Sequence, residues 1–165
     1  MPRRPPVSKV GVVARVGAVA ALLLVGGCAR PVDVDPPRTS AEAARACAAL
    51  VAALPDRVAD QDRREVRSEG GYVAAWGDPA IVLRCGVPRP RGFDRFSGCQ
   101  NANGVDWFIP ESQQSGHPVA VRMTTVGRAQ NVEVSIPEKF FPPVNTMVDL
   151  APALKRTVRK VKPCV

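Results

Sequence analysis

Cysteine is the residue type whose number and spacing indicate most about the chemistry of this chain. Four of the five cysteines lie in the body of the sequence: Cys47, Cys85, Cys99 and Cys164. Their separations of 38, 14 and 65 residues contain no C-x-x-C motif, so neither a thioredoxin-like redox pair nor a zinc ribbon is expected. The only histidine, His117, cannot complete a familiar Cys/His zinc set. An even number of cysteines favours two disulfides in an exported chain.

The N-terminus has the features of an export signal. The basic residues Arg3, Arg4 and Lys9 come first, and residues 16–27 are entirely apolar or glycine. This run of 12 residues is shorter than the roughly 20 that a membrane-spanning helix needs, and it has the length of a signal-peptide core. We therefore expect residues 1–27 to be a signal peptide that is removed on export.

Cys28 follows this apolar run in the sequence Val25-Gly26-Gly27-Cys28. Small residues directly before a cysteine resemble a bacterial lipobox, in which the thiol receives a diacylglyceryl group and becomes the mature N-terminus. The usual pattern has Leu three places before the cysteine and Ala or Ser next, where this chain has Val25 and Gly26. We expect a palmitate-bearing lipid on Cys28 that holds the protein on the extracytoplasmic face of the cell membrane. The alternative is an ordinary secretory signal.

Three disulfide pairings are available to the other cysteines, and we favour Cys47–Cys85 with Cys99–Cys164. Cys47 lies on the apolar face of a predicted helix, and Cys85 ends the most apolar predicted strand, so packing of that helix on that strand would bring them together. Cys99 and Cys164 both lie in peripheral segments. The main alternative joins Cys85 to Cys99 and Cys47 to Cys164. Bridges that close loops of these lengths stabilise a fold by about 4 kcal/mol each.

Catalytic groups are sparse in this sequence. His117 lies in a polar Ser-Gly-His-Pro turn, where an exposed histidine is a simpler interpretation than a general base. There is no G-x-S-x-G, P-loop, dinucleotide-binding, EF-hand or H-E-x-x-H motif. A carboxylate pair for glycan hydrolysis could come from Asp78, Asp94, Asp106 and Glu111. Asp78 is more simply a turn residue, and Asp106 belongs to the polar side of a strand. We expect no metal, no cofactor and no enzymatic activity.

Two groups of aromatic residues could contribute to binding. The segment RGFDRFSG contains Arg91, Phe93, Arg95 and Phe96. Aromatic residues beside arginines on a long loop are typical of partner-binding surfaces, and the alternative is a loop that its two phenylalanines pin to the core. The second group, Trp76, Trp107 and Phe108, could line a ligand groove but is expected in the core.

The formal net charge of +8 does not indicate a nucleic-acid-binding protein. Without the signal, the chain has 19 basic and 15 acidic residues, and five of the basic residues lie close together: Lys155, Arg156, Arg159, Lys160 and Lys162. No aromatic residues alternate with them to stack on bases. We expect this cluster either to contact the anionic membrane beside the lipid anchor or to form a solvated helix end.

Apolar periodicity predicts the elements that position these residues. A helix is expected over 40–54, with Thr39 and Glu42 at capping-box spacing, and a second over about 149–158, with Pro152 in its first turn. Strands are expected at 72–76, 80–85, 104–109, 119–126 and 131–136. Residues 29–38 are expected to form a Pro-rich tether, and 56–70 and 86–103 are expected to be loops.

The predicted order of elements is typical of a single α+β domain over residues 39–165, after a signal at 1–27 and a tether at 28–38. We expect an antiparallel sheet of about five strands with the N-terminal and C-terminal helices packed on one face.

Three stretches of the sequence are similar to a known family. They are AAWGDPAIVLRCGVPRP at 74–90, NGVDWF at 103–108 and VDLAPALKRTV at 148–158. They resemble the actinobacterial exported lipoproteins called domain of unknown function 3515. The resemblance implies an envelope location and supplies no catalytic residue.

These observations predict a lipid-anchored envelope protein that binds a partner protein or a cell-wall ligand without catalysis. The alternative is a small cell-wall hydrolase, which would require Asp78, Asp106 and Glu111 to converge around one cleft.

Overall fold

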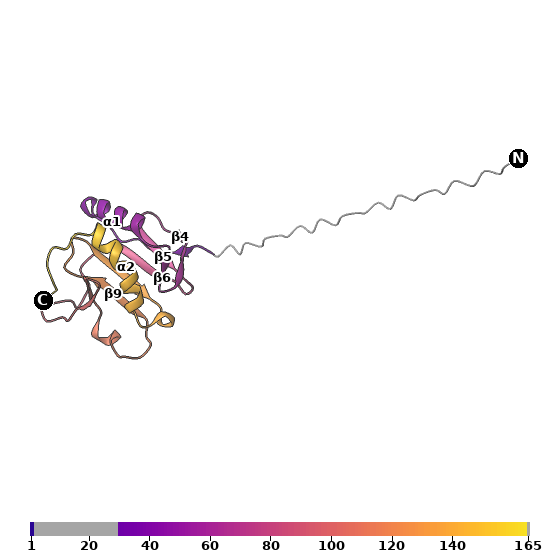
Figure 1. The fold of residues 1–165 in the computed structure, drawn as a ribbon. Helices are drawn as coiled ribbons and strands as arrows, with labels where there is room; N and C mark the ends of the chain where they lie inside the picture. Colours follow the sequence, from indigo (N-terminus) through magenta and orange to yellow (C-terminus); the bar gives the residue numbers. More distant parts are fainter. Residues whose placement is uncertain (2–29, 165) are drawn as a thin grey trace.

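A computed structural model of the chain describes Met1 and residues 30–164. The predicted signal and Cys28 lie outside these residues. The elements are shown in Figure 1. In chain order they are β1 (Val32–Asp33), α1 (Ala41–Ala53), β2 (Arg57–Val58), β3 (Gln61–Arg64), β4 (Val66–Arg67), β5 (Tyr72–Trp76), β6 (Ile81–Val87), β7 (Gln100–Ala102), β8 (Val105–Phe108), η1 (Glu111–Gln113), β9 (Val121–Thr125), β10 (Asn131–Ile136), η2 (Glu138–Phe140) and α2 (Val144–Thr157).

Eight strands form the main sheet, in the order β2-β3-β5-β6-β10-β9-β8-β7. Each neighbouring pair in this sheet is antiparallel, whereas β1 and β4 form a separate parallel pair. The chain is therefore α+β, as predicted, but the sheet is larger than the five strands expected. The strands β5 and β10 have the predicted bounds.

The additional strands lie in segments that were expected to be loops. β2 and β3 belong to the charged segment 56–70, where a turn at Ala59 and Asp60, with φ of 47° and 60°, joins them. Charged side chains at the edge of a sheet remain solvated, so the segment shows no apolar alternation. β7 and β8 are joined by Asn103-Gly104, with φ of 49° and 82°. Asn-Gly is the preferred dipeptide for such a turn, so the sequence did contain the signal for β7.

The helix α1 begins and ends for local reasons. The Ser40 hydroxyl accepts a hydrogen bond from the Ala43 N–H at 3.2 Å and so caps the first turn. Ser40 takes the capping role that Thr39 was expected to have, because Thr39 lies against Gly86 and its hydroxyl donates to the Cys85 carbonyl. Pro55 follows directly after Leu54, the residue that ends the helix.

The helix α2 begins five residues before the predicted start. Pro152 therefore lies in the body of the helix, and not in its first turn as expected. A proline at this position removes one backbone hydrogen bond, to the carbonyl four residues earlier. Pro152 and Val148 are both exposed, so water can reach this side of the helix and satisfy the freed carbonyl.

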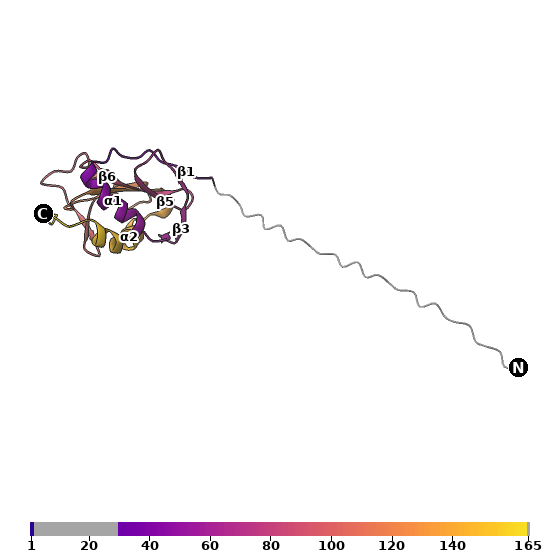
Figure 2. The same ribbon diagram turned by 90° about the horizontal axis from the view of Figure 1, so that it is seen from above.

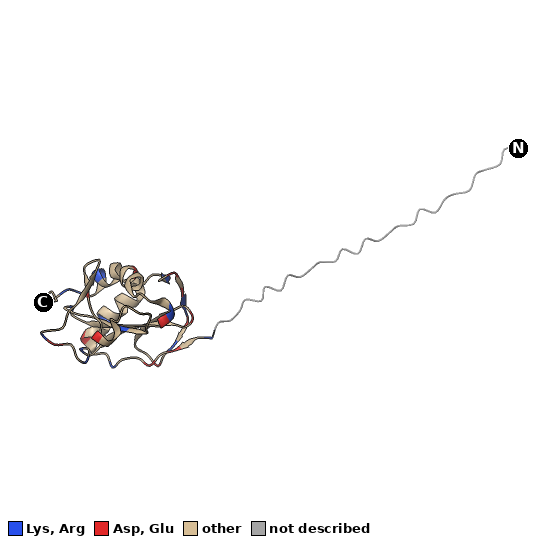
Figure 3. Cartoon of the chain, turned by 90° about the horizontal axis from the view of Figure 1, so that it is seen from below, with Lys and Arg blue, Asp and Glu red and all other residues tan. Residues whose placement is uncertain are grey.

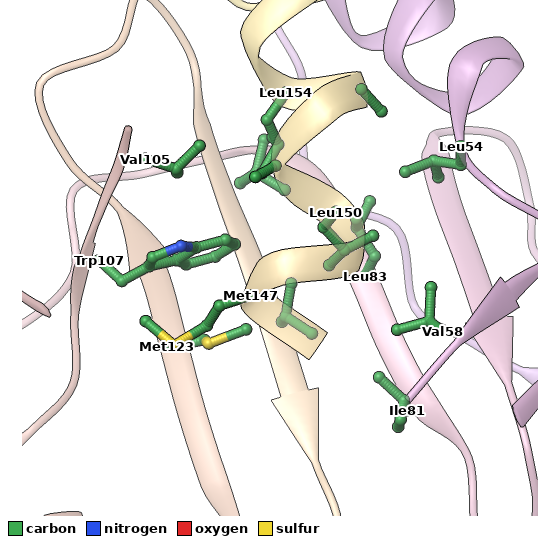
Figure 4. Packing of buried hydrophobic residues seen from close by; sticks show 14 of the residues in the cluster. Leu54, Val58, Ile81, Leu83, Val105, Trp107, Met123, Met147, Leu150 and Leu154 are labelled. Atoms are coloured by element: carbon green, nitrogen blue, oxygen red, sulfur yellow. The ribbon is translucent and has the colours of Figure 1, made fainter. Parts of the chain in front are cut away.

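The hydrophobic core combines residues of both helices with residues of the sheet (Figure 4). α1 packs on β5 and β6, α2 packs on β2, β7 and β8, and the two helices contact each other. Trp76 and Trp107 have no exposed surface, so they belong to this core and not to a ligand groove. The indole N–H of Trp76 donates to the Pro55 carbonyl at 3.0 Å.

Two disulfides support this core, with the pairing favoured from the sequence. Cys47 on α1 is bonded to Cys85 on β6, with the Cα atoms 5.5 Å apart, and both residues are fully buried. Cys99, which precedes β7, is bonded to Cys164 near the C-terminus, with the Cα atoms 6.3 Å apart. The first bridge attaches a helix to the centre of the sheet, and the second attaches the C-terminal segment to its edge.

Side chains of β6 alternate between the core and the opposite face of the sheet. Leu83 and Cys85 are buried in the core, and Arg84 between them points the other way. We call the face that carries Arg84 the outer face. Register places Glu133 of β10 opposite Arg84, Thr124 of β9 opposite Glu133, and Phe108 of β8 opposite Thr124. Directly paired residues share one face, so these four side chains belong to the outer face.

The segment expected as a tether is extended, but it is bound to the domain. β1 pairs with β4, and the Val34 N–H donates to the Arg67 carbonyl at 3.0 Å. The Asp35 carbonyl accepts a hydrogen bond from Arg84 on the outer face, at 3.2 Å. Figure 2 shows the segment running from β1 along the domain to the start of α1. All of these contacts, the core and both disulfides lie within residues 30–164, so a chain without the signal retains every one of them.

Candidate functional site

A groove of about 660 Å³ crosses the outer face. We call it the outer-face groove. Its floor is formed by outward-pointing side chains of β8, β9 and β10, and one wall is formed by the segment from Val87 to Arg91. The floor residues are Phe108, Arg122, Thr124, Glu133 and Ser135, and the far side includes Ala80, Pro110, Gln113 and Pro137. The volume lies in the range of small-ligand sites.

Positive charge predominates around this groove. The only acidic residue among those that line it, Glu133, forms a half-buried ion pair with Arg84 at 3.6 Å. Arg89, Arg91 and Arg122 also line it, and each is exposed. None of these three arginines forms an ion pair within the part of the chain that the structure describes. The groove therefore offers guanidinium groups to an anion, and guanidinium binds carboxylate or phosphate through paired hydrogen bonds.

Hydrogen bonds hold the floor in place and leave one group available. The Arg122 backbone N–H donates to the Gln113 side-chain carbonyl at 2.7 Å, which fixes η1 beside β9. The Ser135 hydroxyl oxygen is buried and has no hydrogen-bond partner among residues 30–164. A buried hydroxyl without a partner costs stability, so a ligand that bonds to it would recover that cost.

The loop that carries the predicted partner-binding residues borders the groove. Phe93 lies on Phe108, with ring centroids 5.1 Å apart, and the Arg89 guanidinium lies 4.9 Å from the Phe93 ring. Phe96, in contrast, is 81% exposed, with the Arg95 guanidinium 4.8 Å from its ring. The interpretation of a pinned loop therefore applies to Phe93, which attaches the loop to the sheet, but not to Phe96, which is presented to solvent.

Asp94 fixes the conformation of this loop at Phe96. Its carboxylate accepts hydrogen bonds from the Phe96 N–H at 2.9 Å and from the Ser97 hydroxyl at 3.0 Å. These bonds, the Phe96 N–H foremost, lower the pKa of Asp94 below its ordinary value, and the nearby Arg89 charge adds to the effect. Asp94 therefore has a structural role in positioning Phe96.

The carboxylates proposed for glycan hydrolysis are not gathered in the groove. Asp78 and Glu111 are exposed, Asp94 is committed to its loop, and none of the four lines the groove. Asp106 is only 9% exposed, and it accepts hydrogen bonds from Asn101 at 2.6 Å and from the Cys164 N–H at 3.4 Å. Lys160 forms an ion pair with it at 3.1 Å. His117 is exposed in its turn, as expected.

The five basic residues near the C-terminus do not share a helix face. α2 ends at Thr157, so Arg159, Lys160 and Lys162 follow the helix, and their segment lies beside Gly127, whose carbonyl accepts the Lys162 N–H. Lys160 is occupied by Asp106. In Figures 1 and 2 the C-terminal end of the domain lies opposite the end that carries β1 and β4. Basic and acidic residues are otherwise spread over many elements (Figure 3).

Arg128, the residue that holds the C-terminal end of α2, was not identified from the sequence. Arg128, which lies between the strands expected at 119–126 and 131–136, is 7% exposed. Its guanidinium donates to the carbonyls of Leu154 at 3.2 Å, Val158 at 2.6 Å and Gly104 at 3.2 Å. It therefore satisfies carbonyls at the C-terminal end of α2, and its burial lowers its pKa. Nothing in the sequence around Arg128 distinguishes it from an exposed turn arginine.

Residues 30–164 contain neither a metal-ligand cluster nor a membrane-spanning helix. No group of three or more His, Cys, Asp or Glu side chains there could hold a metal ion. No helix in the same range is long and apolar enough to cross a membrane.

Comparison with known proteins identifies the family of the chain but not an activity. No curated protein and no solved structure shows a significant match. A family model described as "Protein of unknown function (DUF3515)" matches residues 7–163, which confirms the resemblance to domain of unknown function 3515. The chain therefore belongs to the DUF3515 family.

Proposed function

We propose that the protein is a lipid-anchored envelope protein whose domain binds an anionic ligand in the outer-face groove. Anchoring is supported by the apolar run that ends in Gly26-Gly27-Cys28. Binding is supported by one observation above all. The groove is lined by three arginines without acidic partners in the described residues, beside a loop that exposes Phe96.

The arrangement of the helices fits this proposal. We infer that α1 and α2 cover the same face of the sheet, which leaves the outer face to the ligand and the N-terminal segment. Three sets of contacts support this inference: those of α1 with β5 and β6, those of α2 with β2, β7 and β8, and those between the two helices.

Binding fits the groove better than hydrolysis does. Glycosidases use two carboxyl groups that flank the scissile bond. The groove is lined by one acid, Glu133, which is paired with Arg84. If the protein is an enzyme of that class, purified protein will cleave cell-wall glycan and Glu133→Gln will abolish the cleavage. We expect no cleavage.

Lipid labelling tests the anchor. Cys28→Ala removes the only acceptor thiol at the end of the signal, so we expect no incorporation of a labelled fatty acid and release from the membrane fraction. Gly26→Ala is the matched control, because alanine is usual at that place in the lipobox, and it should be labelled like the wild type. Equal labelling of the Cys28→Ala variant would refute the anchor assignment.

Crosslinking in cells tests the binding site. A photoreactive residue at Gln113, inside the groove, should crosslink to a ligand. The same photoreactive residue at Asp62 should not crosslink to the ligand. The Asp62 side chain is 88% exposed, and its strand, β3, does not contribute to the floor of the groove. Crosslinks of equal yield from both positions would count against a specific site in the groove.

A further inference from the structure

We propose that the outer-face groove and its loop bind the phosphate headgroups of anionic membrane lipids, with Phe96 entering the interface of the bilayer. This inference rests on the proposed function, since it names the ligand of the same groove. Three independent observations lead to it: the charge of the groove, the exposure of Phe96 and the path of the N-terminal segment.

The charge of the groove matches a phosphate and not a neutral headgroup. Arg91 and Arg122 line the groove without ionic partners in the described chain, and Arg89 lies beside them, stacked on Phe93. Guanidinium groups bind phosphate oxygens in pairs, which adds geometric specificity to the attraction. Asp94 is the acid near Arg89, and its carboxylate is already occupied by Phe96 and Ser97.

Phe96 gives the loop beside the groove an exposed apolar side chain. Phe96 has 81% of its surface exposed, and the Asp94 hydrogen bond to its N–H fixes the backbone at this position. Phe93, three residues earlier, shows that the loop could have buried its aromatic residues on the sheet. Aromatic side chains next to cationic ones are the composition of segments that lie in a membrane interface.

The N-terminal segment brings the outer face to the bilayer. Residues 32–35 are bonded to the domain, and the Asp35 carbonyl is bonded to Arg84, which is itself paired with the groove residue Glu133. Cys28 is four residues before Val32. Four extended residues span at most about 14 Å, so a lipid on Cys28 would hold this face close to the headgroups.

Vesicle binding of the chain that begins at Ala29 tests the proposal without the lipid anchor. The probes are vesicles of phosphatidylglycerol with phosphatidylcholine, and vesicles of phosphatidylcholine alone. We expect binding only to the first, and weakening as salt rises. Because each basic residue near an anionic surface strengthens binding about fivefold, Arg89→Gln, Arg91→Gln and Arg122→Gln together should weaken it about a hundredfold.

A control of equal charge separates the groove from the net charge of the protein. Lys155→Gln, Arg156→Gln and Arg159→Gln remove the same three charges at the C-terminal end, and this triple variant should bind almost as the parent does. Equal losses in both triple variants would overturn the groove assignment. Thermal unfolding of each variant shows whether the fold is retained.

The role of Phe96 has its own readout. Trp76 and Trp107 are fully buried, so their fluorescence provides a constant background. Phe96→Trp should shift to shorter wavelength on anionic vesicles and remain unchanged with inorganic phosphate, whereas Phe96→Ala should bind more weakly than the parent. An unshifted spectrum, binding to neutral vesicles, or binding of an acidic peptide in place of vesicles would overturn the headgroup assignment. None of these results bears on lipid labelling of Cys28, so the anchor is judged separately.

Discussion

At the scale of single residues, Asp106 shows how burial changes the environment of a carboxylate. Its position on a strand suggested a solvated carboxylate, but pairing of β7 with β8 and closure of the C-terminal segment enclose it. Burial by itself raises the pKa of Asp106. The hydrogen bonds from Asn101, Lys160 and the Cys164 N–H, together with the Lys160 charge, outweigh this effect and lower the pKa below the ordinary 3.8.

This lowered pKa predicts a dependence of stability on acid. The charged form of Asp106 is favoured by folding, so its contribution is complete well above pH 3.8 and is lost as the pH falls through the lower native pKa. Asp106→Asn should lower the free energy of unfolding by about 1 to 3 kcal/mol at pH 7 and by less at pH 2, as measured by urea unfolding. Asp62→Asn, which removes an exposed ion pair with Arg57, is the control and should have little effect at either pH. An equal loss of unfolding free energy for Asp106→Asn at both values of pH would contradict the lowered pKa of Asp106.

At the same scale, the sequence predicted the roles of residues that have a local signature. It did not predict the roles that depend on partners far away in the sequence. The cysteine pairing followed from an apolar helix face and an apolar strand. The difference between Phe93 and Phe96 could not be predicted, because both lie in one loop and only Phe93 meets Phe108. Arg128 was missed because its three acceptors come from parts of the chain that tertiary folding brings together.

At the scale of elements, strands with apolar alternation were predicted and strands with charged or polar residues were not. β5 and β10 have the expected bounds, whereas β3 contains Gln61, Asp62, Arg63 and Arg64. β3 becomes a strand because β2 and β5 satisfy its backbone on both sides. The positions that line the groove could be predicted only in part, since the groove depends on the register between β8, β9 and β10.

The two disulfides support different elements and should differ in access to reductant. Thiol–disulfide exchange requires that the attacking thiolate reach a sulfur atom. Cys47 and Cys85 are 0% exposed, between α1 and β6. Cys99 and Cys164, in contrast, are partly exposed at the edge of the sheet. We expect limiting reductant to open Cys99–Cys164 first in the native protein, detected by alkylation and peptide mapping. In denaturant the two bridges should open at similar rates, and earlier alkylation of Cys47 and Cys85 in native protein would contradict the prediction.

At the scale of the whole molecule, the two ends of the segment 30–164 lie at opposite ends of the domain (Figure 2). β1 is at one end, and residues 158–164 are at the other. A domain of this size has a radius of gyration of about 14 Å, so the chain from Cys28 to Val32, four residues further on, cannot reach from one end to the other. This separation opposes the idea that the C-terminal basic cluster contacts the membrane beside the anchor, and it favours the outer face.

The proposed anchor therefore predicts which end of the domain is near the bilayer. In lipidated protein on neutral vesicles, where the anchor alone acts, a fluorophore on Glu69→Cys, close to β4, should transfer energy to acceptor-labelled lipid more efficiently than one on Lys162→Cys. Twelve Gly and Ser residues inserted after Ala29 should remove most of this difference, because a flexible linker of that length spans about 20 Å and lets the domain turn. More efficient transfer from Lys162→Cys would place the basic cluster at the membrane and contradict the orientation. A difference that the insertion leaves unchanged would mean that contacts of the domain, and not the short connection to Cys28, set the orientation.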